Sequence, residues 1–104
     1  MNSLTVFTDK NFEKEVERTG KPVFVDFWSA YCEPCKIQMP VVEEIAKESS
    51  GKIKAGEFEV GGNPDIPAKY QILSIPALAI FQNGKISQLK FGLQKYRIPQ
   101  ENDR

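Results

Sequence analysis

The chain has 104 residues, of which 40% are hydrophobic and 11% aromatic. This is enough to bury the core of one compact domain, so we expect a single domain over residues 1–104 that needs no disulfide framework. The 14 basic and 14 acidic residues cancel, and no basic cluster stands out. Nucleic acid is therefore not an expected partner, because phosphate binding rests on clustered positive charge.

The sequence lacks two features that would direct the protein to a membrane or out of the cytoplasm. No apolar run approaches the roughly eighteen residues of a membrane-spanning helix, so no membrane partner is expected. Residues 1–7 also lack the basic region and long apolar run of a signal peptide. The sequence therefore predicts a cytoplasmic protein. Structural disulfides are rare there, and a cysteine pair is more often catalytic or metal-binding.

The N-terminal part of the chain predicts a strand and a helix. Residues 4–7 form a short β-prone run. Residues 8–11 then offer capping side chains before an amphipathic segment in which Phe12 and Val16 lie four residues apart. Gly20 and Lys21-Pro22 end this helix.

The middle of the chain predicts a buried strand, a long helix and another strand. Residues 23–28 are almost continuously apolar, as in strands buried on both faces, and a single acid, Asp26, interrupts them. Residues 34–49 carry apolar side chains on one helical face. Residues 53–60 read as a strand, and the glycine-rich segment 61–64 is a loop.

The last predicted elements are one or two helical turns over 67–70 and a hairpin. Residues 77–81 and 85–91 flank Asn83-Gly84, which is the strongest short hairpin signal. The order β-α-β-α-β-α-β-β predicts an α/β fold, with a mixed sheet of about five strands and helices on both faces.

The chemistry is expected at Cys32-Glu33-Pro34-Cys35, which follows a buried strand and opens a helix. One helical turn separates the two Cα atoms by about 5 Å, inside the disulfide range. Cys32 lies at the helix N-terminus, where unpaired N–H groups stabilise a thiolate, the attacking species. Cys35 should be shielded and act second, and Pro34 suits the first helical turn.

Two other interpretations of the cysteine pair are possible. The pair is half of a zinc site if carboxylates or a second subunit supply the other ligands, because zinc takes four and the chain has no histidine and no third cysteine. It is a structural feature if both cysteines are simply small buried residues. We expect no metal.

Two further features lie near the cysteines in the predicted fold. Asp26 should have a pKa raised by desolvation, so it could exchange a proton near neutral pH and accept the proton of Cys35. A paired structural acid is the alternative. The segment Ser74-Ile75-Pro76 leads into a strand, and its X-Pro bond could be cis.

Together these residues resemble the thioredoxin family. The matches follow the family's order and spacing from about Leu4 to Gly92, and their joint occurrence is far more specific than C-x-x-C alone. They are Val25-Asp26-Phe27-Trp28, Cys32-x-Pro34-Cys35-Lys36, Pro40, Asn63-Pro64, Tyr70, Ile75-Pro76, Asn83-Gly84 and Gly92.

The resemblance implies a thioredoxin-like fold and a protein-disulfide reductase. Cys32 would be the nucleophile, Cys35 the resolving thiol, Asp26 the buried proton carrier and Pro76 a cis-proline beside the disulfide. The backbone of Ile75 would pair with an extended substrate peptide. The surface for protein substrates would comprise Trp28, Tyr31, Pro34, Ser74, Ile75 and Gly92. Thioredoxin reductase would recycle a monomeric protein, which has no cofactor motif of its own.

The sequence also departs from the family pattern. Glu33 replaces the usual glycine, and Tyr31 the usual tryptophan. An acid beside Cys32 disfavours the thiolate and shifts the couple towards stronger reduction, although solvent screens this effect. Glu57 stands where many members carry a lysine near the buried aspartate, so two acids there raise one pKa further or force Glu57 outward. We therefore expect Glu33, Lys36 and Glu57 to tune the redox chemistry.

The C-terminal helix of the family is expected to be short or irregular over residues 93–104, since Pro99 falls inside it and apolar periodicity is weak.

Two other functions remain possible on the same fold. One is a disulfide oxidant or isomerase, which the reduction potential would separate from a reductase. The other is a binding module or assembly subunit without turnover, since a fold alone does not prove activity.

Overall fold

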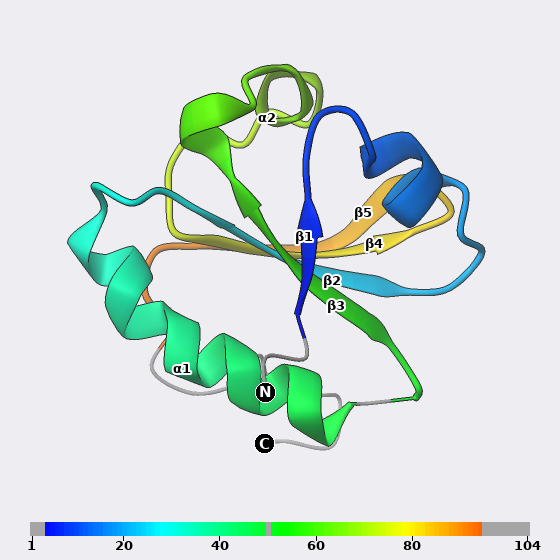
Figure 1. Ribbon diagram of the computed structural model, residues 1–104, viewed down its shortest axis with the longest axis horizontal. Helices are drawn as coiled ribbons and strands as arrows, with labels where there is room; N and C mark the ends of the chain where they lie inside the picture. The colour runs from blue at the N-terminus through cyan, green and yellow to red at the C-terminus, as the bar shows by residue number, and fades with distance from the viewer. Residues whose placement is uncertain (1–3, 50, 95–104) are drawn as a thin grey trace.

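The computed structural model describes residues 4–49 and 51–94, and it contains one mixed sheet in the order β1-β3-β2-β4-β5 (Figure 1). Strands β1 and β2 run parallel to β3, whereas β4 is antiparallel to both β2 and β5. The strands are β1 (Thr5–Phe7), β2 (Val23–Trp28), β3 (Lys54–Glu59), β4 (Ala77–Gln82) and β5 (Lys85–Phe91). The predicted α/β class and five-stranded mixed sheet are confirmed.

Helical segments pack on both faces of the sheet, as predicted (Figure 1). They are the π-helix η1 (Glu13–Glu17), the α-helix α1 (Glu33–Glu48), the 3₁₀ turn η2 (Val60–Gly62) and the α-helix α2 (Asp65–Lys69). The predicted N-terminal helix is thus reduced to five residues of π-type hydrogen bonding, in which the Arg18 N–H donates to the Glu13 carbonyl at 2.9 Å. None of the helices in the described residues is long and apolar enough to cross a bilayer.

One face of the sheet is covered by η1 and α2 and is rich in phenylalanine. The Phe12 ring meets the rings of Phe7, Phe58 and Phe81 edge to face, with centroids 5.2 to 6.1 Å apart. Aromatic pairs prefer this geometry because the positive edge of one ring faces the negative face of the other. The core on this side is therefore built around Phe12, which is fully buried.

The other face is covered by α1 and is mainly aliphatic. Val42 and Ala46 of α1 pack with Phe24 of β2, Ala55 of β3 and Leu78 of β4. The side chain of Asp26 belongs to this face as well, because side chains two apart on a strand point the same way and Phe24 lies here. A carboxyl group is thus enclosed between the central strand and the long helix.

The capping segment before η1 serves a different helix from the one predicted. Thr8 and Asn11 do exchange hydrogen bonds, from the Thr8 N–H to the Asn11 side chain at 2.7 Å and from the Asn11 N–H to the Thr8 hydroxyl at 3.2 Å. The carboxylate of Asp9, however, accepts the N–H groups of Asp65 and Ile66, each at 2.9 Å. Asp9 therefore caps α2 across the fold, where the unpaired N–H groups of a helix attract a negative charge.

The prediction for the C-terminal helix lies mostly outside the described residues. Leu93 and Gln94 are described and are not helical.

Gly56 of β3 provides a test of the packing on the phenylalanine face. A Cβ atom at this position would overlap both the Phe7 ring and the Thr5 carbonyl. We expect Gly56→Ala to lower the free energy of unfolding by about 3 kcal/mol, as overpacking does in a dense core. The control is Gly62→Ala, because a Cβ there meets nothing within 4 Å. Equal denaturant midpoints for the two variants would contradict the packing described.

Candidate active site

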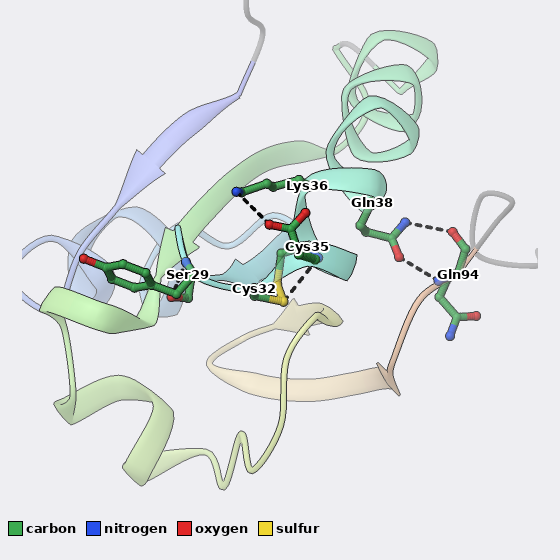
Figure 2. The surroundings of a disulfide bond; sticks show 8 residues. Ser29, Cys32, Cys35, Lys36, Gln38 and Gln94 are labelled. Atoms are coloured by element: carbon green, nitrogen blue, oxygen red, sulfur yellow. Dashed lines mark hydrogen bonds and ion pairs between the residues drawn. A yellow bond between two sulfur atoms is a disulfide. The ribbon is translucent and has the colours of Figure 1, made fainter.

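Cys32 and Cys35 form a disulfide at the N-terminus of α1, with their Cα atoms 5.2 Å apart (Figure 2). Cys32 is the N-cap residue of the helix, and the Cys35 N–H donates a hydrogen bond to Cys32 Sγ at 3.2 Å. This is the geometry that the sequence predicts. The same N–H group and the helix dipole will stabilise a thiolate on Cys32 once the disulfide is reduced.

The turn between β2 and α1 presents the disulfide at the surface. The Ser29 carbonyl accepts the Cys32 N–H at 3.1 Å, and the Ser29 hydroxyl accepts the Tyr31 N–H at 3.2 Å. Pro34 follows in the first turn of α1, where a missing N–H leaves no gap in the helical hydrogen bonding. The turn is short and internally bonded, so it holds the cysteines at a defined distance from the sheet.

The two sulfur-bearing residues differ in their access to solvent. Cys32 is half-buried, whereas Cys35 is fully buried. Of the two cysteines, Cys32 is therefore the one that is more accessible from outside the protein.

Asp26 is the most unusual residue of β2, the strand that leads to the disulfide. It is fully buried, and neither of its carboxylate oxygens has a hydrogen-bond partner among the described residues. Burial, and then the negative charge of Glu57, raise its pKa from 3.8 to about 7. The carboxyl group can therefore bind and release a proton near neutral pH, as predicted from the sequence.

Glu57 is the cross-strand neighbour of Asp26. The two residues are paired in the parallel register of β2 and β3, so both side chains lie on the face covered by α1. Glu57 is half-buried rather than turned out to solvent. Of the two outcomes considered from the sequence, the structure therefore has the one in which Glu57 raises the pKa of Asp26.

The negative charge of Glu33 is paired with the positive charge of Lys36. Its carboxylate accepts a hydrogen bond from the Lys36 ammonium at 3.1 Å (Figure 2), and both side chains are largely exposed, at 81% and 56%. The pair thus partly neutralises the acid, and water screens the remainder.

Three more predicted site residues come together at the end of the sheet where β2 leads into the turn before Cys32. Ala77 pairs with Phe27 on one side and with Phe91 on the other, so Pro76 lies near both Trp28 and Gly92. The Ile75–Pro76 bond is cis, and the Gly92 N–H donates to the Pro76 carbonyl at 2.8 Å. Gly92 has a φ of 86°, which favours glycine at this position.

The predicted surface residues differ in exposure. Tyr31 is 96% exposed, Pro34 and Ser74 are exposed, and Trp28 and Ile75 are half-buried. Leu73 was not predicted from the sequence, yet it is 84% exposed beside Ser74. The sequence does place this leucine close to the predicted cis-proline. A single leucine in a loop is too common, however, to indicate a binding surface by itself.

Gln38 is the second residue that the sequence analysis missed. It is fully buried, and its side-chain amide makes two hydrogen bonds to the backbone of Gln94 (Figure 2). The sequence signal for Gln38 was a polar residue within the buried stripe of α1 formed by Cys35, Val42 and Ala46.

In the part of the chain that the structure describes, no group of three or more His, Cys, Asp or Glu residues is arranged to hold a metal ion.

The raised pKa of Asp26 predicts a pH-dependent stability difference. Between pH values of about 4 and 7 the unfolded chain loses this proton while the folded protein keeps it, so folding becomes less favourable as the pH rises. We expect Asp26→Asn to stabilise the oxidised protein by up to about 4 kcal/mol above pH 7, with the gain shrinking towards pH 4. Denaturant unfolding at several pH values measures this.

Glu57→Gln is the companion variant, because it removes the neighbouring charge and leaves Asp26 in place. The titration midpoint of the Asp26 carboxyl carbon, followed by NMR, should move to lower pH. A stability gain of Asp26→Asn that does not vary with pH, or an unmoved midpoint in Glu57→Gln, would contradict this account of the buried acid.

Comparison with known proteins agrees with the geometry. The thioredoxin family model matches residues 3–100. A thioredoxin of Rickettsia felis is 46% identical over 88 residues, which are 85% of this chain and 84% of that protein. A thioredoxin of Buchnera aphidicola subsp. Schizaphis graminum is 45% identical over 92 residues, or 88% and 85% of the two chains. The chain therefore belongs to the thioredoxin family and is a thiol–disulfide oxidoreductase that reduces protein disulfides.

Proposed function

We propose that the protein reduces its partners by two successive exchanges, in which Cys32 attacks and Cys35 resolves. The observation that carries this order is the difference in burial between the two cysteines of one disulfide, half-buried Cys32 at the helix N-terminus and fully buried Cys35 behind it.

In the first exchange, the Cys32 thiolate attacks one sulfur of a partner disulfide. The partner's sulfur–sulfur bond breaks, its second sulfur leaves as a thiolate that takes up a proton, and a mixed disulfide joins Cys32 to the partner. In the second exchange, the Cys35 thiolate attacks Cys32 Sγ and the partner leaves as a dithiol. Two electrons and two protons pass from the cysteine pair to the partner.

Asp26 accepts the Cys35 proton in the second exchange, directly or through a bridging water. Its unpartnered oxygens, its position on the face covered by α1 and its pKa of about 7 support this role. A base with a pKa near the working pH is the most effective one for a proton transfer of this kind. Glu57 keeps that pKa high and therefore tunes the same step.

Partner proteins bind as an extended strand at the end of the sheet beside the disulfide. The half-buried Ile75, before the cis-proline Pro76, offers its backbone for strand addition, which provides affinity through main-chain hydrogen bonds. The side chains of this surface are those of Trp28, Tyr31, Pro34, Leu73 and Ser74, and Gly92 contributes its backbone. The exposed apolar members of the surface favour partners with apolar residues flanking the disulfide.

Recycling requires an external electron donor, for which we propose a thioredoxin reductase that supplies its own cofactors. The protein itself then acts as a cytoplasmic, monomeric electron carrier with no cofactor.

A redox titration tests the proposed function. The protein is equilibrated in graded dithiol/disulfide buffers, and free thiols are alkylated and counted by mass. We expect a reversible two-electron transition at a strongly reducing potential. Cys32→Ser should lose reduction of insulin, whereas Cys35→Ser should accumulate a mixed disulfide through Cys32. A markedly more oxidising midpoint would indicate an oxidant or isomerase, and no reversible disulfide at all would leave a binding module.

The Glu33–Lys36 pair predicts a small electrostatic contribution to the reduction potential. Replacing Glu33 by Gln removes the acid beside Cys32 and frees the Lys36 ammonium, so the thiolate becomes easier to form. We expect Glu33→Gln to make the potential less negative by less than about 30 mV, and the shift to shrink at high salt. Glu44→Gln, an exposed change later on α1, is the control. A shift to a more negative potential would contradict this interpretation.

A further inference from the structure

Gln38 occupies an apolar position of α1 with a polar side chain. It lies one turn after Cys35 and is fully buried. Its Nε2 donates to the Gln94 carbonyl at 2.8 Å, and its Oε1 accepts the Gln94 N–H at 2.6 Å (Figure 2). Because burying an amide without partners is costly, the side chain is stable here only while the backbone of Gln94 lies against it.

The hydrogen bonds of Gln38 continue into the predicted docking surface. The side chain of Gln94 donates to the Gly92 carbonyl at 3.3 Å, and the Gly92 N–H donates to the Pro76 carbonyl at 2.8 Å. A chain of polar contacts therefore runs from α1 through residues 92–94 to the cis-proline. It connects the helix that carries the disulfide to two segments that would contact a partner.

These two hydrogen bonds connect the segment after β5 to α1. Gln94 has no regular secondary structure of its own, and Gly92 has a backbone conformation with no side chain to fix it. The Gln38 amide provides two directional bonds that define where this segment lies. A partner that docks on a segment already in place loses less conformational entropy on binding.

We propose that Gln38 is a positioning residue for protein substrates. Its amide holds residues 92–94 against α1 and so fixes the docking surface relative to Cys32. The inference rests on the proposed function, because it assigns Gly92 to that surface. Small disulfides need access only to the Cys32 sulfur, so their reduction does not depend on Gln38.

The test compares two substrates with the pre-reduced protein. Gln38→Met keeps the size of the side chain and removes both hydrogen bonds. We expect it to lower the second-order rate constant for reduction of insulin about fivefold, equivalent to about 1 kcal/mol, and to leave the rate with dithionitrobenzoate unchanged. The reduction potential should also stay the same. The matched control is Gln88→Met, which makes the same change at an exposed position of β5.

Gln94→Pro breaks one of the same bonds from the other side, because proline has no N–H. It also removes the side-chain hydrogen bonds of Gln94 to the Phe91 and Gly92 carbonyls. Its selective loss should therefore be at least as large as that of Gln38→Met, and the double variant should lose little more than Gln94→Pro alone, since both changes disrupt the same contact between Gln38 and Gln94. Should Gln38→Met not fold, Gln94→Pro carries the same expectation at a half-exposed position. Equal losses with both substrates, or no loss with either, would overturn the inference. A wild-type protein that reduces neither substrate would instead overturn the proposed function.

Discussion

Strand β2 is hydrogen-bonded along both edges, to β3 in parallel and to β4 in antiparallel register, and the rest of the molecule depends on this pairing. The parallel neighbour places Glu57 beside Asp26, and the antiparallel neighbour brings Pro76 to the end of β2. The strand then passes through a short turn into α1, so the disulfide forms where the sheet, the helix and the cis-proline segment meet. A shift of one residue in this register would turn Asp26 to the phenylalanine face.

The function that we propose for the buried acid comes at a cost to the stability of the fold. Asp26 has no hydrogen-bond partner among the described residues, and a second acid lies next to it, so its ionised form is unfavourable. A leucine or asparagine at this position would pack with less electrostatic cost. The chain keeps a carboxyl group whose pKa of about 7 suits proton exchange with a buried thiol.

The sequence predicted most of the fold because its signals were local. The apolar run of β2, the Asn83-Gly84 turn and the periodicity of α1 each reported one element. The contacts that it did not predict join residues far apart in the chain. Asp9 caps α2 and not the helix that follows it, and Gln38 binds the backbone of Gln94. The identity of a side chain indicates which groups it can hydrogen-bond, but it does not indicate which distant segment of the chain will supply those groups.

The arrangement of the two cysteines also bears on oxidative damage. When the pair is reduced, a peroxide meets the half-buried Cys32 first, while Cys35 is enclosed by protein. Oxidation of Cys32 to a sulfenic acid would place a reactive sulfur beside a second thiol whose Cα lies 5.2 Å away. Condensation to the disulfide then competes with further oxidation to the irreversible sulfinic and sulfonic acids. Cys35, which completes the proposed catalytic cycle, would therefore also protect Cys32 from irreversible oxidation. The product of mild oxidation is then the disulfide, which is a normal state of the protein.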